Sequence, residues 1–187
     1  MNVIEKGACV GKGTRISYFS HVVASAVNGI DCVLGQNVFV GNYVKIGNKC
    51  KIQNNVSLFE GVELEDYVFC GPSMVFTNVI NPRCKFPQNE SQFYKKTLIK
   101  EGASIGANAT IVCGNTLGRH CFIGSGAVVT KNVPDYAIII GVPGRQSGWM
   151  SEGGKTLNFD ENNEAYCDKS KTTYRLIDNV VTRISES

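Results

Sequence analysis

Residues 34–69 divide into consecutive six-residue units, which read LGQNVF, VGNYVK, IGNKCK, IQNNVS, LFEGVE and LEDYVF. Each unit opens with an apolar residue, and the residue four places later is small or apolar. The same spacing reaches back to Ile4 and, after an interruption, runs from Ile99 to Val129, with Asn28 as its one polar member. A period of six fits neither an α-helix, with 3.6 residues per turn, nor a strand of period two.

The period of six predicts short strands separated by tight corners, with three units forming one turn of a parallel β-helix. Glycine follows the opening residue in many units, and Asn or Gly often comes next, so the corners have the backbone freedom that they need. The pattern I-G-x-x-[AV]-x is the signature of the left-handed β-helix. We therefore expect an all-β fold, a left-handed parallel β-helix with one long inserted loop and a small C-terminal β extension.

An interruption separates the two parts of the repeat. Phe76 and Ile99 are successive opening residues, but the chain between them is several units long instead of one. The excess must leave the β-helix as a loop at about 79–98, which contains four cations and a single acid. A long ordered loop in a compact repeat domain is usually functional. The alternative is a solvent-exposed loop on the surface of the β-helix that has no function.

The repeat array of about 130 residues predicts a single β-helix domain at 1–149, followed by an extension at 150–187. The segment IIIGVPGR at 138–145 is expected to leave the repeat as an extended strand. Within the extension, TYRLI at 173–177 and NVVTRI at 179–184 are expected to form short strands. We expect no second globular domain.

The charge and hydropathy of the chain limit its partners. A net charge of +3 does not suggest nucleic-acid binding, but it suits phosphorylated ligands. No apolar run reaches transmembrane length, and the first residues lack a charged segment followed by an apolar one. We therefore expect a soluble, cytoplasmic protein that binds neither nucleic acid nor membrane.

The eight cysteines contain no C-x-x-C pair. Cys32, Cys50, Cys70 and Cys121 fall at inward positions of the repeat, where a reduced thiol packs as a small apolar group. A zinc ribbon needs paired cysteines, and only Cys167 lies in the extension, so we expect no metal site.

One coil consists of three six-residue units, so residues one coil apart stack at roughly 4.8 Å, the spacing between strands. Asn42, Glu60 and Asn78 therefore form one column, which Cys113 and Lys131 continue once the inserted loop is excised. Within this column Asn78 stands at the mouth of the loop, where a ligand can reach it. We therefore expect a functional role for Asn78.

Two further ladders join Gln36 to Asn54 and Asn37 to Asn55. Asn and Gln satisfy each other when they stack along neighbouring strands, which is a purely structural interpretation. The alternative is that Asn37, Asn54 and Asn55 bind substrate, and the sequence alone leaves both interpretations open.

Several segments resemble one group of enzymes. QNNVS at 53–57, CGPSMVFTNV at 70–79, NPR at 81–83 and the segment at 123–150 are similar to hexapeptide-repeat acyltransferases that acetylate the amino group of nucleotide-linked 3-amino sugars. The resemblance covers about residues 10–152. Within this group it points to the UDP-2-acetamido-3-amino-2,3-dideoxy-glucuronate N-acetyltransferases of bacterial O-antigen synthesis.

The resemblance implies a homotrimer of parallel prisms, with acetyl-coenzyme A (acetyl-CoA) in the groove between two neighbours and the nucleotide-sugar beside it. It also implies that Asn78, in the matching F-T-N segment, lies next to the sugar amine, and we assign the adjacent Thr77 to substrate binding. A dTDP-linked 3-amino-3,6-dideoxyhexose is the nearest rival acceptor, because nothing in the sequence visibly distinguishes UDP from dTDP.

Histidine is the usual general base in hexapeptide acyltransferases, and the chain has two, His21 and His120. His21 precedes Asn78 by about three coils, or roughly 15 Å, and His120 lies about one face further round the prism. An amine with a pKa of roughly 8 is already partly neutral at cellular pH, so its acetylation can depend mainly on proximity and orientation. Asn78 is then the hydrogen-bond acceptor that orients the amine.

The thioester oxygen needs a backbone N–H as it becomes an oxyanion, and the coil near Ala107 or Ser125 supplies a candidate donor, with the choice between the two left open. Phosphates need cations. Arg83, Lys95 and Lys96 of the loop suit the nucleotide pyrophosphate. Lys131 and Arg145, in and after the last units, suit the coenzyme A phosphates.

Three other functions are weighed against this one. A γ-class carbonic anhydrase needs three histidine ligands for zinc, which two histidines cannot supply in one symmetric site. An O-acetyltransferase would require His21 or His120 as its base. Two features argue against a non-enzymatic scaffold. The basic loop is inserted where a substrate would bind, and the G-V-P-G-R exit segment resembles that of the coenzyme-binding enzymes.

Overall fold

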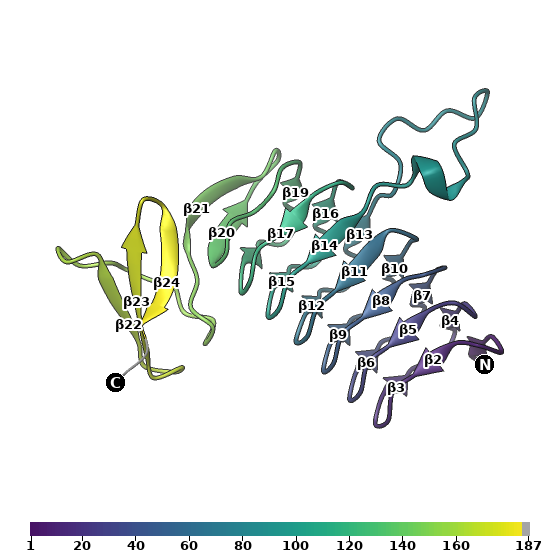
Figure 1. Cartoon of the computed structure of the whole chain (residues 1–187), viewed down its shortest axis with the longest axis horizontal. Coiled ribbons are helices and arrows are strands. Elements are labelled where there is room, and N and C mark those ends of the chain that lie inside the picture. The colour runs from purple at the N-terminus through teal and green to yellow at the C-terminus, as the bar shows by residue number, and fades with distance from the viewer. Residues whose placement is uncertain (185–187) are drawn as a thin grey trace.

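The computed structural model describes residues 1–184 and consists of a left-handed parallel β-helix with a small antiparallel sheet at its C-terminal end (Figure 1). Short strands follow one another around the prism, and from β1 to β16 each pairs in parallel with the strand three places later in the chain. The three faces of the prism are called sheets A, B and C. The corners are called A–B, B–C and C–A in chain order.

The strands of each sheet are stacked in chain order. Sheet A contains β1 (Val3–Ile4), β4 (His21–Val22), β7 (Phe39–Val40), β10 (Ser57–Leu58), β13 (Val75–Phe76), β16 (Thr110–Ile111) and β19 (Val128–Val129). Sheet B contains β2 (Cys9–Val10), β5 (Val27–Asn28), β8 (Lys45–Ile46), β11 (Val62–Leu64), β14 (Thr97–Ile99) and β17 (Thr116–Leu117). Sheet C contains β3 (Arg15–Ile16), β6 (Val33–Leu34), β9 (Lys51–Ile52), β12 (Phe69–Cys70), β15 (Ser104–Ile105), β18 (Phe122–Ile123), β20 (Ala137–Ile140) and β21 (Arg145–Trp149).

The pairing register confirms the repeat and the length of the inserted loop. His21 pairs with Phe39, exactly one coil later. Across the loop, Val62 pairs with Thr97, the partner that excision of the loop predicts. The expected loop boundary at 98 is wrong, because Thr97 and Leu98 already belong to β14. The strand begins there since the Thr97 N–H donates to the Gly61 carbonyl at 2.8 Å and so rejoins the ladder.

The interior of the prism is filled by the opening residues of the repeat units. From Val22 to Val129 these side chains are buried, including the polar Asn28, whose Nδ2 donates to the Cys9 carbonyl at 3.3 Å. The first coil is different, because within residues 1–184 no coil packs on its outer side. Ile4 and Val10 are therefore 49% and 38% exposed, unlike the opening residues of the later coils.

The four cysteines that were expected to face inward are buried, and this placement is confirmed. Burial raises the pKa of the Cys70 and Cys121 thiols to about 12. Thiols with such pKa values stay protonated at neutral pH, and an uncharged thiol packs as an apolar group.

The C-terminal part begins with a hairpin that closes the prism. The segment after β20 folds back through Gly141–Gly144 into β21, which pairs antiparallel with β20, so the expected extended exit strand is wrong. A three-stranded antiparallel sheet follows, made of β22 (Glu164–Cys167), β23 (Thr172–Ile177) and β24 (Val180–Ile184), and the two strands expected there are confirmed. The last three residues of the expected extension, 185–187, lie outside the described residues.

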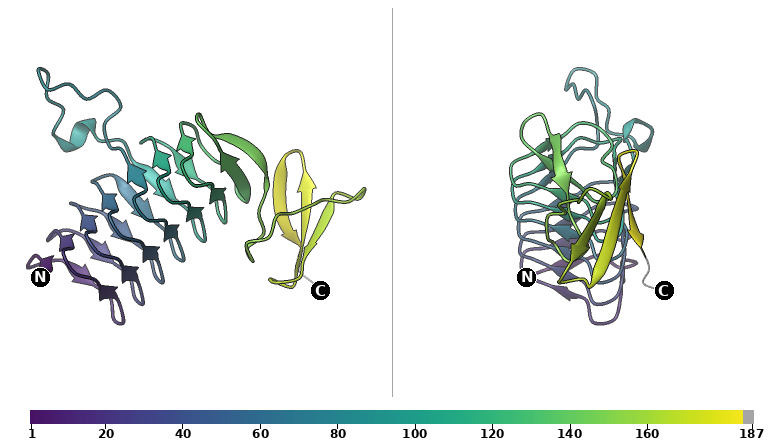
Figure 2. Two further views of the ribbon diagram at one scale, coloured as in Figure 1. Left: turned by 180° about the vertical axis from the view of Figure 1, so that it is seen from behind. Right: turned by 90° about the vertical axis from the view of Figure 1, so that its left-hand side faces the viewer.

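The inserted loop and the three-stranded sheet occupy separate places on the molecule. Figure 2 shows the loop projecting from the side of the stack and the sheet lying at its C-terminal end. The loop contains one short 3₁₀ helix, η1 (Ser91–Phe93), and is mostly exposed. Within residues 1–184, no helix has the length and apolarity needed to cross a membrane.

Candidate active site at the corners of sheet A

Asn78 lies at the A–B corner, where the loop leaves the prism (Figure 1). The Lys95 N–H donates to the Asn78 carbonyl at 2.9 Å, which closes the neck of the loop. The neighbouring Thr77 Oγ1 accepts a hydrogen bond of 3.0 Å from the Cys113 N–H of the next coil. The Asn78 side chain is half-buried, and within residues 1–184 its amide has no hydrogen-bond partner. Its backbone is thus fixed while its amide is free to bind a ligand.

The expected column through Asn78 follows from the strand register. Ser57 pairs with Val75, and Val75 pairs with Thr110, so the residues three places after them also stack. Glu60 therefore lies one coil before Asn78. Cys113 lies one coil after Asn78, but this residue is only 2% exposed and cannot meet a ligand. Lys131, at the next level, is exposed.

A cavity of about 580 Å³ adjoins this column. It lies between the A–B corner, the outer face of sheet B and the returning end of the loop, and its lining includes Tyr43, Lys45, Glu60, Glu63, Tyr94 and Lys96. Lys96 is the one predicted site residue among them. The coil spacing could have placed Lys45 beside Glu63, but Tyr94 belongs to the irregular loop and carries no such signal.

The predicted asparagine ladders are at the other edge of sheet A, at the C–A corner. The Asn37 Nδ2 donates to the Asn55 Oδ1 at 3.0 Å, and the Gln36 N–H donates to the Asn54 Oδ1 at 2.8 Å. Asn37 and Asn55 also have positive φ angles of 55° and 60°, a conformation that asparagine tolerates better than most residues. These hydrogen bonds support the structural interpretation of the ladders. Within one chain, Asn37, Asn54 and Asn55 lie at a different corner from Asn78.

Ala107 and Ser125 occupy the same C–A corner nearer the C-terminal end. The Ala107 carbonyl accepts a 2.9 Å hydrogen bond from the Gly126 N–H. The N–H groups of Ala107 and Ser125 have no hydrogen-bond partner within the part of the chain that the structure describes. Both are therefore available to bind an oxygen atom of a ligand.

The exit hairpin lies against this corner. The Gly144 N–H donates to the Val128 carbonyl at 2.7 Å, which holds the turn beside β19. Arg145, the next residue, is exposed, and its Nη1 donates to the Gly144 carbonyl at 3.1 Å. Ala107, Ser125 and Arg145 thus share one corner, whereas Lys131 lies across sheet A from them. Arg83 is exposed on the loop, where its Nη1 donates to the Pro82 carbonyl at 2.9 Å.

Neither histidine lies at the corner that holds Asn78. His21 Nε2 is 2.7 Å from Glu5 Oε1, and its ring meets the Phe39 ring edge-on at a centroid distance of 5.6 Å. The hydrogen bond from His21, followed by one from the Ala24 N–H, lowers the pKa of Glu5. His21 is thereby oriented by structural neighbours on the first coils of sheet A.

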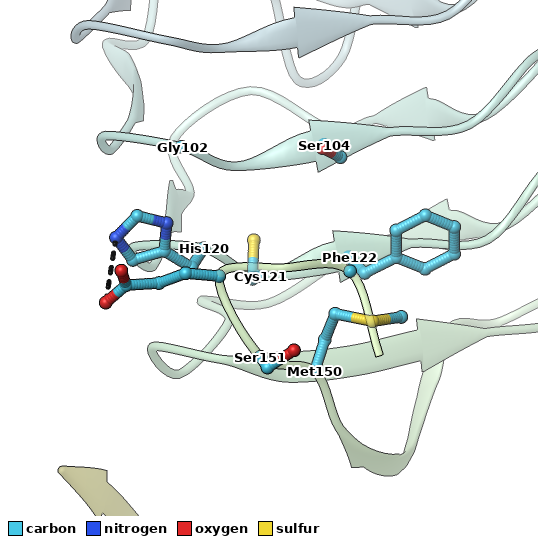
Figure 3. A pocket seen from close by; sticks show the side chains of 9 residues that line it. Gly102, Ser104, His120, Cys121, Phe122, Met150 and Ser151 are labelled. Atoms are coloured by element: carbon cyan, nitrogen blue, oxygen red, sulfur yellow. Dashed lines mark ion pairs between the residues drawn. The ribbon is translucent and has the colours of Figure 1, made fainter. Parts of the chain in front are cut away.

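His120 lies at the B–C corner and lines a separate cavity of about 130 Å³ between sheet C and the start of the extension (Figure 3). Its Nε2 is 3.8 Å from Glu152 Oε1, and its ring stacks on Tyr136 at a centroid distance of 5.3 Å. Burial and the Glu152 carboxylate raise the pKa of Tyr136, whose hydroxyl donates to Glu152 at 3.1 Å. This cluster attaches the extension to the prism.

Comparison with known proteins supports the repeat assignment. Residues 29–60 and 97–131, on either side of the loop, match the family model described as the hexapeptide repeat of succinyl-transferase. A dTDP-3-amino-3,6-dideoxy-alpha-D-galactopyranose 3-N-acetyltransferase of Aneurinibacillus thermoaerophilus is 40% identical over 91 residues, which are 49% of this chain and 46% of that protein. The bifunctional protein GlmU of Bradyrhizobium sp. is 38% identical over 144 residues, covering 74% of this chain and 32% of its own length. The chain thus spans less than half of the length of both relatives.

Two solved structures share the fold. The acetyltransferase domain of PglB from Neisseria gonorrhoeae, in complex with acetyl coenzyme A, aligns with a TM-score of 0.56 at 19% identity and covers 78% of this chain and 57% of that one. AntD, an N-acyltransferase from Bacillus cereus, aligns with a TM-score of 0.53 at 20% identity and covers 80% and 84%. At these identities the likeness establishes the common β-helix.

Proposed function

We propose that this protein transfers the acetyl group of acetyl-CoA to the amine of a nucleotide-linked amino sugar. The observation that carries the proposal is the free, half-buried amide of Asn78 at the neck of the loop, beside a cavity of about 580 Å³. The relative from Aneurinibacillus, which is named for acetylation of such an amine, supports it. We take residues 1–149 as the catalytic β-helix domain, residues 150–187 as an extension, and the cytoplasm, where acetyl-CoA is found, as its location.

The proposed reaction begins with the neutral amine, because only its free electron pair can attack the thioester carbon. The C–N bond forms as the C–S bond breaks, the amine loses one proton, and the departing coenzyme A thiolate takes up one. The Asn78 side-chain oxygen accepts a hydrogen bond from the amine and so holds its lone pair toward the thioester. The N–H of Ala107 or Ser125 donates to the thioester oxygen as its negative charge develops.

Asn78 lies at the A–B corner, whereas Ala107 and Ser125 lie at the C–A corner, on the opposite edge of sheet A. A single prism therefore does not bring them together. A homotrimer in which sheet A faces the threefold axis would bring the A–B corner of one copy to the C–A corner of its neighbour. The outward side chains of sheet A support this arrangement because none of them is an acid, lysine or arginine: Val3, His21, Phe39, Ser57, Val75, Thr110 and Val128. Acetyl-CoA would lie in the groove between two copies.

The acceptor that we favour is a dTDP-linked 3-amino-3,6-dideoxyhexose, used in the synthesis of a bacterial surface polysaccharide such as O-antigen. The relative at 40% identity is named for this kind of substrate, which is why we prefer it to UDP-2-acetamido-3-amino-2,3-dideoxy-glucuronate. Arg83 and Lys96 of the loop are proposed to pair with the pyrophosphate, with Thr77 beside them. Lys131 and Arg145 are proposed to pair with the coenzyme A phosphates.

A thiol-release assay with acetyl-CoA and a panel of acceptors tests the proposal. We expect coenzyme A release with nucleotide-linked 3-amino sugars and none with serine or with a galactoside, which are acceptors of O-acetyltransferases. Release with the hydroxyl acceptors alone would overturn the proposal in favour of O-acetylation. No release with any acceptor would favour a non-enzymatic role.

A further inference from the structure

The 580 Å³ cavity is lined by Glu60 and Gly61, which occupy the A–B corner one coil before Asn78. Tyr94 and Lys96, which also line the cavity, flank Lys95, whose N–H donates to the Asn78 carbonyl. The volume falls within the range of roughly 300–1,000 Å³ that is typical of small-molecule sites. Asn78 itself is not part of the lining, and a group held in the cavity beside Glu60 lies about one strand spacing, roughly 4.8 Å, from the coil of Asn78.

The charges around this cavity favour a cationic or neutral ligand over an anionic one. Three carboxylates, Glu60, Glu63 and Glu65, face two ammonium groups, Lys45 and Lys96. Glu65 is already engaged, because its Oε2 accepts a 2.9 Å hydrogen bond from a backbone N–H of the next coil. Glu60 and Glu63 have no hydrogen-bond or ion-pair partner within residues 1–184. Glu65 keeps its charge when it accepts this hydrogen bond, so the lining has one more negative than positive charge, and this excess favours an amine over a carboxylate.

The aromatic lining suits a sugar ring rather than a pyrophosphate. Tyr43 is 69% exposed at the A–B corner, and Tyr94 is half-buried on the returning loop. Each tyrosine offers an apolar ring face and a hydroxyl that can bond to a polar group. A sugar presents the same combination of C–H surface and hydroxyl groups, whereas a pyrophosphate presents only charged oxygens.

We infer that this cavity is the subsite for the sugar ring, and that its carboxylates select an amino sugar that carries no carboxylate of its own. The inference rests on the proposed acetyl transfer and extends it to the choice of sugar. A 6-deoxy amino sugar fits this subsite, and an amino uronic acid is disfavoured by Glu60 and Glu63. The nucleotide then lies at the mouth of the cavity, with its pyrophosphate against the exposed Lys96.

The test compares two acceptors that share one nucleotide and one 3-amine but have either a methyl group or a carboxylate at C6. We expect the wild-type protein to use the methyl compound with a kcat/KM at least tenfold higher. Glu63→Lys should reduce this preference about tenfold, mainly by improving use of the carboxylate compound, and Glu63→Gln should reduce it less. Glu63 is exposed on β11, so both variants should fold. Glu161→Lys, an equal charge change on the exposed surface of the extension, is the matched control.

Binding of the same two acceptors, measured by calorimetry without acetyl-CoA, should show the same preference in Kd. Tyr94→Ala should weaken binding of the methyl acceptor while the affinity for dTDP alone stays the same. Equal use of both acceptors, a preference that Glu63→Lys alters no more than Glu161→Lys, or loss of dTDP binding in Tyr94→Ala would overturn the inference and leave the proposed function intact. Absence of acetyl transfer to either acceptor would instead overturn the proposed function, and the inference with it.

Discussion

Asn78 and Lys95 stand at the two ends of the inserted loop, yet a backbone hydrogen bond of 2.9 Å joins them. The loop therefore leaves and rejoins the β-helix at one point, and the coil closes beneath it as if the loop were absent. The same bond holds the backbone of Asn78 while its side chain stays free. A residue with a fixed backbone and an unpaired amide is well suited to orient a reacting group.

Asn78→Ala should lower kcat/KM for the amino-sugar acceptor by roughly fivefold to 150-fold, because about 1–3 kcal/mol of transition-state stabilisation depends on its hydrogen bond. The melting temperature should not change, since the amide has no partner within residues 1–184. Steady-state kinetics and thermal unfolding measure the two effects. Asn162→Ala, in the exposed part of the extension, is the control. Equal kinetics for the two variants would remove Asn78 from the site.

Neither His21→Asn nor His120→Asn should abolish acetyl transfer to the amine. The two histidines are held by Glu5 and Glu152, and neither lies at the corner of Asn78. The kcat/KM should rise with pH as the substrate amine loses its proton. A loss above about a thousandfold in either variant would show that a histidine acts as general base. It would also favour an O-acetyltransferase.

Val75→Arg should convert the proposed trimer to a monomer and remove its activity, because Val75 is 46% exposed on sheet A, whose outward side chains include no acid, lysine or arginine. A charge buried without a partner is strongly unfavourable at an interface. Light scattering should give about three times the 20.3 kDa of one chain for the wild type and one chain mass for the variant. An active monomer would contradict a site shared between copies.

Gly106→Ala should destabilise the protein by about 1–3 kcal/mol, which is typical of overpacking. A Cβ at this position would lie 2.5 Å from the backbone nitrogen of Ser125 in the next coil. The coil would have to shift, and the candidate N–H donors at the C–A corner would move with it. Urea unfolding measures the loss. Gly148→Ala is the control, because a Cβ there meets its nearest atom at 3.8 Å.

Acid should weaken the first coils of the prism. The hydrogen bonds from His21 and the Ala24 N–H lower the folded-state pKa of Glu5 below its ordinary value of 4.5. A depressed pKa contributes stability above pH 4.5, and this contribution is lost as the pH falls through the folded-state pKa. Glu5→Gln should therefore flatten the acid side of the curve of unfolding free energy against pH. A curve as steep as that of a matched Glu161→Gln variant would contradict this.

The fold could be predicted from the sequence because a β-helix repeats one local rule. The period of six assigns Val22 to Val129 to the interior without any knowledge of long-range contacts. The rule fails where neighbouring coils are missing or the chain reverses. Ile4 has no coil before it, and the segment after Ile140 turns back on itself instead of continuing.

The six-residue period predicts only part of the candidate site. The coil spacing stacks Asn78 over Glu60 and pairs Asn37 with Asn55, and both relationships follow from register alone. Tyr94 was missed because it lies in the loop, where no period applies. The unpaired N–H groups of Ala107 and Ser125 depend on the exact stacking of corners, which a residue pattern does not specify.

The stacking of whole coils also sets a scale of length along the prism. Asn78 follows β13, and the exit turn lies beside β19, two strand spacings or roughly 10 Å further along sheet A. Inserting or deleting one complete coil between them would change this separation by about 4.8 Å and leave every corner in register. The number of coils thus sets the distance between the reacting amine at Asn78 and the exit turn, where the coenzyme A phosphates are proposed to bind. A prism of this kind can adjust that reach only in steps of one whole coil, the separation that pairs His21 with Phe39.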